Sequence, residues 1–347
     1  MVSEATYRKA VKIFFLCIIW YTVSSINNVV TKLILNDFPY PMTVTMVHLV
    51  STTLYSMPVM IIWDIPSSAR VPLRLWFKLI LPLALGKVFA SVSSHVSIWK
   101  VPVSYAHTVK ATMPLFTVIL SWLIIGEKIT FKIFMSLVPI VGGVAIATVT
   151  ELSFNIIGLV SALSATLGFA LQNILSKKCL RETGIHHLRL LYVLAMMAAL
   201  CMLPIWAFRD LRMLLVDSTV TIHAPKLTAL LFIESLCGFL QNLVAFTVIA
   251  LVTPLSYAVA NASKRISIIT VSLIFLRNPV SPMNVFGMSL AVVGVLAYNK
   301  VLHCLLLHSK CFLTLSLADQ TGPTKGHGQP TNDRESRFTV HQWTHLE

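Results

Sequence analysis

The sequence predicts an all-α integral membrane protein with ten transmembrane helices, arranged as a five-plus-five inverted repeat. The first observation is composition, since 56% of the 347 residues are hydrophobic and only 12% are charged. The second is that the apolar residues come in blocks of about twenty, the length of a membrane-spanning helix. The third is an internal repeat. A soluble chain of this length would show shorter apolar runs alternating with charged helix faces, so a soluble globular fold is excluded.

The apolar blocks are separated by charged or Pro-rich connections. Each block is long enough to cross a hydrocarbon core of about 30 Å at about 1.5 Å per residue. The expected spans are residues 13–35, 43–63, 76–98, 103–125, 131–150, 154–176, 189–208, 227–250, 255–276 and 283–302.

The ends of the chain and the positive charges of the connections predict an orientation. Residues 1–12 lead directly into the first span with no small-residue cleavage site, so we expect this span to remain as a signal anchor. Most Lys and Arg residues outside the spans lie at the amino end, in the even-numbered connections and in the tail. Both termini are therefore expected in the cytosol. Residues 303–347, rich in Gly, Pro and mixed charge towards the end, are expected to form a partly disordered cytosolic tail.

The internal repeat relates residues 13–150 to residues 151–302. Ser104-Tyr105-Ala106, two residues after Pro102, recurs as Ser256-Tyr257-Ala258, two residues after Pro254. Gly86 and Gly142 match Gly238 and Gly294 at the same offset. An odd number of spans in each copy gives the second copy the opposite polarity in the membrane. Inverted repeats of this kind are typical of secondary transporters with a substrate site near the midplane.

Charge and motifs exclude several other functions. The net charge of +14 is what cytoplasmic loops of membrane proteins collect, so it does not indicate nucleic acid, and no nucleic-acid partner is expected. The six cysteines have no CxxC spacing, so neither a metal site nor a disulfide framework is expected. There is no Walker loop, metal-binding helix motif or nucleophile elbow. We therefore expect no enzyme activity, no cofactor and no metal.

Five basic residues lie inside the expected spans, against the single acid Glu234. A charge near the bilayer centre is costly and usually faces a water-filled cavity or a partner. Lys32 lies near a helix end and can reach the interface by extending its side chain. Lys87 is deeper, and pairing with Glu234 or capping of a carbonyl would explain it. The other three are Lys110, Lys264 and Arg265.

Lys110 and the Lys264-Arg265 pair are the candidates for substrate binding. Lys110 lies among polar neighbours that include His107, and Pro114 follows one turn later. Two adjacent cations in one buried turn repel each other, and a bound anion is the simplest partner. Arg offers a planar fork and Lys a compact charge, which together suit a phosphoryl group. His107, like His95, is either a hydrogen-bonded core residue or a ligand, and Tyr257 either packs between helices or contacts substrate.

Four stretches carry a resemblance to the triose-phosphate/nucleotide-sugar transporter family of the drug/metabolite transporter superfamily, within solute carrier family 35. They are Val101-Pro-Val-Ser-Tyr-Ala-His-Thr-Val-Lys-Ala111, Thr148-Val-Thr-Glu-Leu-Ser-Phe154, Gln172-Asn-Ile-Leu-Ser-Lys-Lys178 and Ser256-Tyr-Ala-Val-Ala-Asn-Ala-Ser-Lys-Arg265. The resemblance covers about residues 10–302. It implies ten helices and exchange of a phosphorylated sugar or nucleotide sugar for phosphate or a nucleotide monophosphate.

The resemblance also implies roles for particular residues. Plastid sugar-phosphate members clamp the phosphate with a Lys in the fourth helix and a Lys-Arg pair in the ninth, which match Lys110, Lys264 and Arg265. Where those members have a His and a hydroxyl residue in the third helix, this sequence has Ser91 and Ser94. Gln241 stands where they have a Tyr in the eighth helix. The phosphate clamp is thus retained, while the surroundings that select the sugar differ.

These observations together predict an antiporter of a phosphorylated sugar or related organophosphate, exchanged for phosphate by alternating access. The expected location is an endomembrane, the Golgi or the ER. The expected partners are a small organic phosphate anion and the lipid bilayer; the oligomeric state is left open. One alternative is a nucleotide-sugar/nucleotide monophosphate antiporter. Another is a membrane interaction protein that no longer transports and acts through the tail from residue 303.

Overall fold

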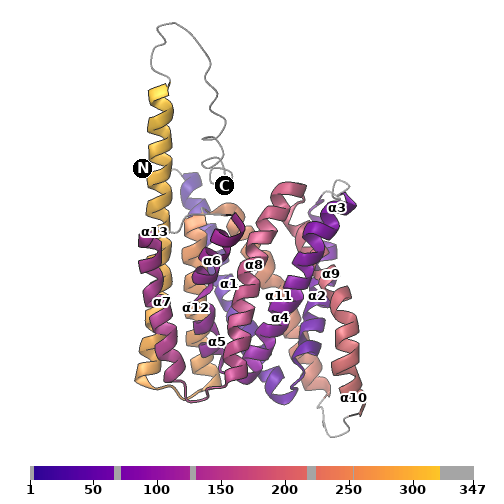
Figure 1. The fold of residues 1–347 in the computed structure, drawn as a ribbon. Helices are drawn as coiled ribbons and strands as arrows, with labels where there is room; N and C mark the ends of the chain where they lie inside the picture. Colours follow the sequence, from indigo (N-terminus) through magenta and orange to yellow (C-terminus); the bar gives the residue numbers. More distant parts are fainter. Residues whose placement is uncertain (1–3, 66–71, 126–129, 217–223, 253, 321–347) are drawn as a thin grey trace.

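The chain is built from helices that run side by side in a single bundle (Figure 1). The computed structural model describes residues 4–65, 72–125, 130–216, 224–252 and 254–320, and no strand is found in these ranges. In chain order the elements are α1 (Glu4–Asp37), α2 (Pro41–Ile62), α3 (Leu73–Leu75), η1 (Trp76–Ile80), α4 (Leu81–Lys100), α5 (Val103–Lys110), α6 (Met113–Ile125), α7 (Phe131–Val149), α8 (Ile156–Thr183), α9 (His187–Trp206), η2 (Ala207–Leu211), α10 (Arg212–Val216), α11 (Ala224–Leu251), α12 (Pro254–Leu276) and α13 (Pro282–Gln320).

Among the described residues, nine helical segments are long and apolar enough to cross a membrane. They cover nine of the ten expected spans. The remaining one, 255–276, is helical as α12 but is not counted among the nine. The all-α membrane fold is therefore confirmed, while the number ten stays a prediction. The first part of the expected tail, residues 303–320, continues α13 as helix. Residues 321–347 of that tail lie outside the described residues.

The outside of the bundle is apolar, and its interior holds polar side chains beside an apolar core. Large hydrophobic side chains are exposed on the outer surface, with Ile61 79% and Val149 87% exposed. Meanwhile Ser24, Thr31 and Thr45 are almost fully buried. Lipid favours an apolar exterior, and hydroxyl and amide side chains tolerate burial where they find partners inside the protein. This distribution is that of a membrane protein with polar side chains in its interior.

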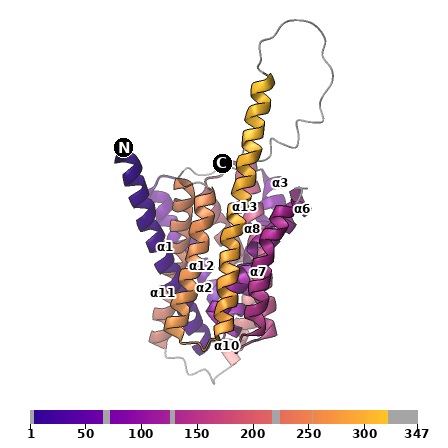
Figure 2. The same cartoon turned by 90° about the vertical axis from the view of Figure 1, so that its left-hand side faces the viewer.

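The helices that pack most extensively come from opposite halves of the chain. α1 packs on α11, α4 on α8, α2 on α9 and α7 on α13. Figures 1 and 2 both show α7 alongside α13. Here glycines let the two backbones touch: a Cβ on Gly287 would lie 2.6 Å from the nitrogen of Ala147, and one on Gly294 2.8 Å from the nitrogen of Ile140. Small residues at such a seam allow close helix approach within a membrane.

Two charged side chains cap helix ends and fix how neighbouring helices join. The Nζ of Lys32 donates hydrogen bonds to the carbonyls of Ile98, Trp99 and Val101 at 2.8, 3.1 and 3.1 Å, where α4 ends. Asp210 accepts hydrogen bonds from the backbone N–H and hydroxyl of Thr43 at the start of α2, both at 2.9 Å. Each charge has the sign that the helix end favours. Lys32 thus has a structural role, but it binds carbonyls inside the protein instead of extending to the interface.

Candidate anion-binding site

The fourth expected span is broken immediately after Lys110, and this break positions the first candidate cation. α5 ends at Lys110 and α6 begins at Met113. In a continuous helix the carbonyl of Lys110 would accept from residue 114, but Pro114 has no N–H and its ring clashes with that carbonyl. The backbone turns instead through bonds from Ala111 N to Thr108 O and from Thr112 N to Val109 O, both 3.0 Å. Lys110 is therefore the last residue of a short buried helix.

Lys110 lies inside the bundle with a hydroxyl as its partner. The side chain is 8% exposed, and Nζ donates to the Oγ of Ser94 on α4 at 2.8 Å. A neutral hydroxyl does not compensate the charge of an ammonium group. Ser94, which the resemblance placed near the substrate, is thus in direct contact with the first cation.

Lys264 and Arg265, on α12, have weak partners. The Nζ of Lys264 lies 4.4 Å from the ring centroid of Trp20 on α1. The Nη2 of Arg265 lies 3.7 Å from the sulfur of Met113, the residue with which α6 begins. The Nη1 of Arg265 is buried and has no hydrogen-bond partner among the described residues. A guanidinium has five donors, so this one retains unused hydrogen-bonding capacity.

The structure brings the three cations together from the two halves of the chain. α5 packs against α12, and the positive charges of Lys110, Lys264 and Arg265 interact with one another. The ion pairs of the described part of the chain join His48 to Glu234, Lys178 to Glu182 and Lys226 to Asp37, and none involves these cations. Three like charges with no carboxylate partner form a site whose chemistry favours an anion. Arg265 supplies the planar fork that fits a phosphoryl group.

Other residues singled out from the sequence have different surroundings. The Nε2 of His107 lies 2.8 Å from the Oδ1 of Asn28 on α1. Because the amide nitrogen of Asn28 donates to the carbonyl of Ser24, Oδ1 is the acceptor and His107 donates. His107 therefore ties α5 to α1 one turn before Lys110. The Oε1 of Gln241 on α11 is buried without a partner among the described residues. The side chain of Tyr257 lies outside the described residues.

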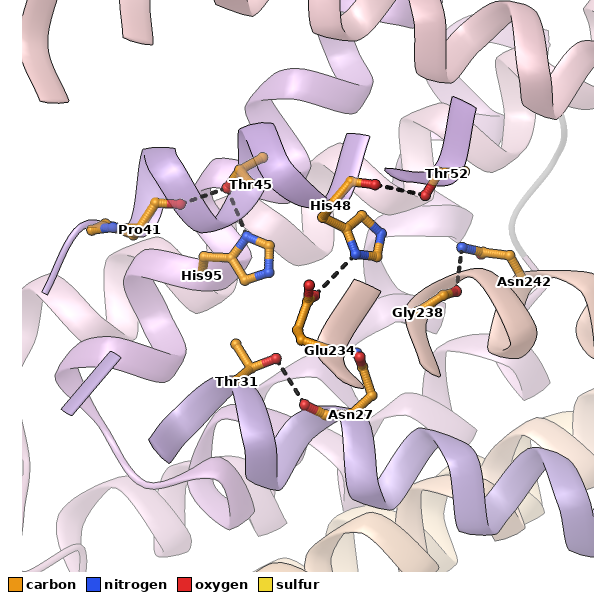
Figure 3. A network of polar contacts seen from close by, with 10 residues as sticks. All are labelled: Asn27, Thr31, Pro41, Thr45, His48, Thr52, His95, Glu234, Gly238 and Asn242. Atoms are coloured by element: carbon orange, nitrogen blue, oxygen red, sulfur yellow. Dashed lines mark hydrogen bonds and ion pairs between the residues drawn. The ribbon is translucent and has the colours of Figure 1, made fainter. Parts of the chain in front are cut away.

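Glu234, the one acid within the expected spans, has a partner that the sequence did not indicate. Glu234 pairs with His48, whose Nδ1 lies 3.0 Å from Oε1, as Figure 3 shows. Neither contact suggested for Lys87, with Glu234 or with a carbonyl, is present among the described residues. Trp20 and Met113 were also missed, because an aromatic ring or thioether in an apolar span gives no signal of a cation nearby. His95, which was noted, donates to Thr45 close to this pair.

Comparison with known proteins finds relatives over most of the chain. Residues 11–299 match the Triose-phosphate Transporter family. The chain is 31% identical over 303 residues to glucose-6-phosphate/phosphate translocator 1, chloroplastic, of Arabidopsis thaliana, covering 86% of this chain and 76% of that protein. It is 33% identical over 294 residues to phosphoenolpyruvate/phosphate translocator 3, chloroplastic, of Oryza sativa subsp. japonica, covering 81% and 72%.

A third relative is named for a different substrate. The triose phosphate/phosphate translocator, chloroplastic, of Zea mays is 32% identical over 291 residues, covering 83% of this chain and 70% of that protein. All three alignments include most of the membrane bundle. The chain therefore belongs to the triose-phosphate transporter family.

Proposed function

We propose that this protein is an antiporter that exchanges a phosphorylated sugar or a related organophosphate for phosphate. The observation that carries the proposal is the group of three interior cations, Lys110, Lys264 and Arg265, with no acidic partner among the described residues. The relatives support it, because their names pair phosphate with glucose 6-phosphate, phosphoenolpyruvate or triose phosphate. The phosphoryl group is the part that all these compounds share.

Each cation has a distinct role in holding the phosphoryl group. Arg265 binds two oxygens with its planar fork, using Nη1, which has no partner among the described residues. Lys264 leaves the ring of Trp20, a contact worth only about 0.5–2 kcal/mol, for the stronger charge–charge contact. Lys110 remains oriented by Ser94 while its other two ammonium donors bind phosphate.

These three cations, Lys110, Lys264 and Arg265, form the phosphate clamp. The organic part of the substrate then lies beside the clamp. Gln241 is suited to it, because its buried Oε1 lacks a donor among the described residues and a sugar hydroxyl supplies one. Tyr257 is also assigned to this part, and His107 is assigned to positioning Lys110 through its bond to Asn28. Ser91 and Ser94 replace the His and hydroxyl residue of the plastid members, so the surroundings of the sugar differ from theirs.

Transport occurs by alternating access of two five-helix repeats, residues 13–150 and 151–302. The pairing of helices supports this division, since the contact of α1 with α11 corresponds to that of α8 with α4 when the two halves are exchanged. A two-fold relation gives two equivalent conformations, one open to each side of the membrane. In Figure 1 the start of α1 and the end of α13 lie at the same end of the bundle, as cytosolic termini require.

The membrane is proposed to be that of the Golgi or the ER. The named relatives are chloroplastic, so the alternative location is a plastid envelope. A fluorescent fusion at the carboxyl end, imaged with Golgi, ER and plastid markers in the source cells, decides between them. Cytosolic termini predict that this fluorescence is quenched by an impermeant quencher in cells whose plasma membrane alone is permeabilised.

The test of the function is counter-exchange in proteoliposomes. Vesicles loaded with phosphate are supplied with labelled glucose 6-phosphate, triose phosphate, phosphoenolpyruvate or a nucleotide sugar. We expect uptake of at least one phosphorylated compound, dependent on internal phosphate. Lys264→Ala combined with Arg265→Ala removes two charge-assisted contacts worth about 1.5–3 kcal/mol each, so uptake falls by about a hundredfold or more.

The chain offers a matched control for this double variant. Lys177 and Lys178 are also adjacent, but both are exposed and Lys178 pairs with Glu182 on the same helix. Replacing both by Ala removes the same charge and leaves exchange unchanged. Full activity of the Lys264/Arg265 variant would overturn the site. Exchange that depends on an internal nucleotide monophosphate and ignores phosphate would favour the nucleotide-sugar alternative.

A further inference from the structure

A buried acid lies apart from the clamp, and the proposed function does not use it. Glu234 on α11 is 0% exposed. Its Oε1 lies 3.0 Å from the Nδ1 of His48 on α2. Its Oε2 is buried and has no hydrogen-bond partner among the described residues. A carboxylate oxygen buried in this way is costly, so it marks a position where a ligand or a proton belongs.

His95 on α4 adds a second imidazole to this group, and its tautomer follows from its partner. The hydroxyl of Thr45 donates to the carbonyl of Pro41 at 2.7 Å, so it has no proton left for His95. The Nδ1 of His95, 2.7 Å from that hydroxyl oxygen, is therefore the donor. In the neutral ring Nε2 is left with a lone pair, and Figure 3 shows it on the side of Glu234. The His48 and His95 ring centroids are 6.2 Å apart.

The shape of the site indicates the size of its ligand. Glu234 has no accessible surface, so no sugar or phosphate reaches it in this conformation. The ring of His48 occupies the space above Gly238, where a Cβ would lie 2.7 Å from Nδ1, and this packing fixes the ring against α11. The side chain of His48 is nonetheless 17% exposed. A proton needs no cavity, and His48 gives it a route to Glu234.

The surrounding helices bring few other titratable groups to this site. α11 itself contributes Cys237, which interacts with Glu234. α1 contributes Lys32, whose Nζ binds the carbonyls at the end of α4. Between residues 190 and 206, α9 holds only Tyr192 and Cys201 as titratable groups. The cations of α12 contact Trp20 and Met113, as described above.

One residue, His95, is a neighbour of both the acid and the clamp. His95 interacts electrostatically with Glu234, His48 and Lys110. His95 also directly follows Ser94, the residue that accepts the hydrogen bond of Lys110. A negative charge on Glu234 would oppose the binding of an anion at the clamp, whereas a neutral Glu234 would not. By thermodynamic linkage, the anion and the proton then each strengthen the binding of the other.

We propose that Glu234, served by His48 and His95, is a proton-binding site, and that a proton binds there together with the phosphoryl anion at the clamp. This inference rests on the proposed function. The proton comes from water on the side to which the carrier is open and passes through His48. It converts the carboxylate to the carboxylic acid, and it returns to water when the anion leaves. No other reactant is needed.

The test is the pH dependence of phosphate affinity in the full-length protein, with Glu234→Gln as the variant. The amide keeps the contact with His48 but is neutral at every pH. Phosphate binding is measured by titration of the purified protein at about pH 6 and about pH 8, on either side of the ordinary His range. In the unaltered protein we expect affinity to fall as pH rises, because the proton that assists anion binding becomes scarcer. Glu234→Gln then binds phosphate about fivefold or more tightly than the unaltered protein at the higher pH, and its advantage is smaller at the lower.

Glu151→Gln is the matched control. Glu151 is another buried acid, and it contacts Ser153 and Asn284 near the end of α7. Its variant keeps the pH profile of the unaltered protein, including the part due to titration of phosphate itself. A gain of affinity cannot result from misfolding. Parallel profiles for the unaltered protein and Glu234→Gln overturn the proton site.

A second measurement covers the case in which Glu234→Gln does not fold. Calorimetric titration of the unaltered protein in two buffers of different ionisation enthalpy gives the number of protons taken up with each phosphate. About one proton beyond that required by phosphate itself supports the site, and none overturns it. The Lys264→Ala, Arg265→Ala variant distinguishes failure of the phosphate clamp from failure of the proton site. If that variant binds phosphate normally the clamp is wrong, whatever the proton result.

Discussion

Substitution of Gly143 by Ala tests the seam between α7 and α13. A Cβ at Gly143 would lie 2.7 Å from the carbonyl oxygen of Gly287 and 2.9 Å from the Cα of Ala291. Carbon atoms in ordinary contact are about 3.5–4.0 Å apart, so the helices must separate by about 1 Å. The obstructing atoms belong to the backbone and cannot rotate away. Overpacking of this kind costs about 1–3 kcal/mol.

The neighbouring glycine is the control. A Cβ on Gly142 meets nothing within 4 Å, so Gly142→Ala gains the helix preference of Ala, about 0.5–1 kcal/mol. Each variant adds one methyl group at adjacent positions and gains the same helix preference, yet the two should differ in stability by the overpacking cost, about 1–3 kcal/mol.

The assay is thermal unfolding in detergent, followed by the loss of monodisperse protein on size exclusion. We expect the midpoint of Gly143→Ala to fall by several degrees, since about 1 kcal/mol shifts the midpoint of a large domain by about 2 °C. The midpoint of Gly142→Ala should be unchanged or higher. Equal midpoints for the two variants would mean that the α7 and α13 backbones are not in contact.

Three further substitutions test interactions that hold the site in place. Lys32→Met removes three hydrogen bonds to carbonyls at the end of α4 and should cost about 3 kcal/mol, seen as a lower unfolding midpoint that Lys32→Arg partly restores. Tyr105→Phe removes the 3.0 Å hydrogen bond to the hydroxyl of Thr148 and should cost only about 1 kcal/mol, because no donor is left unpaired. Asn28→Ala leaves the buried N–H of His107 without its acceptor, so a loss of about 1–3 kcal/mol should accompany slower phosphate exchange; unchanged exchange would contradict the positioning role.

The positions of the helices follow from the sequence because apolar runs of membrane length have few alternatives. The break after Lys110 also follows, since Pro114 removes the one N–H that would extend α5. The internal repeat makes the fourth and the ninth spans equivalent, so it indicates a site between them. The interior cations could be identified from residue type alone, because a charged side chain in an apolar span is costly and usually has a function.

The partners of these residues depend on the packing of distant helices. Lys32 binds the carbonyls of residues 98, 99 and 101, and no local pattern indicates that α4 ends beside it. Glu234 was expected to be available to Lys87, yet it pairs with His48, which becomes its neighbour only because Gly238 leaves room for the ring. Such contacts are specified by three-dimensional packing and not by spacing along the chain.

The binding of phosphate by purified variants tests the central claim most directly. Labelled phosphate is titrated against the unaltered protein, the Lys264→Ala, Arg265→Ala variant and the Lys177→Ala, Lys178→Ala control. The proposed clamp predicts saturable binding by the first and the third, and affinity lowered by about a hundredfold or more in the second. Equal affinity in all three would contradict the assignment of phosphoryl binding to the interior cations.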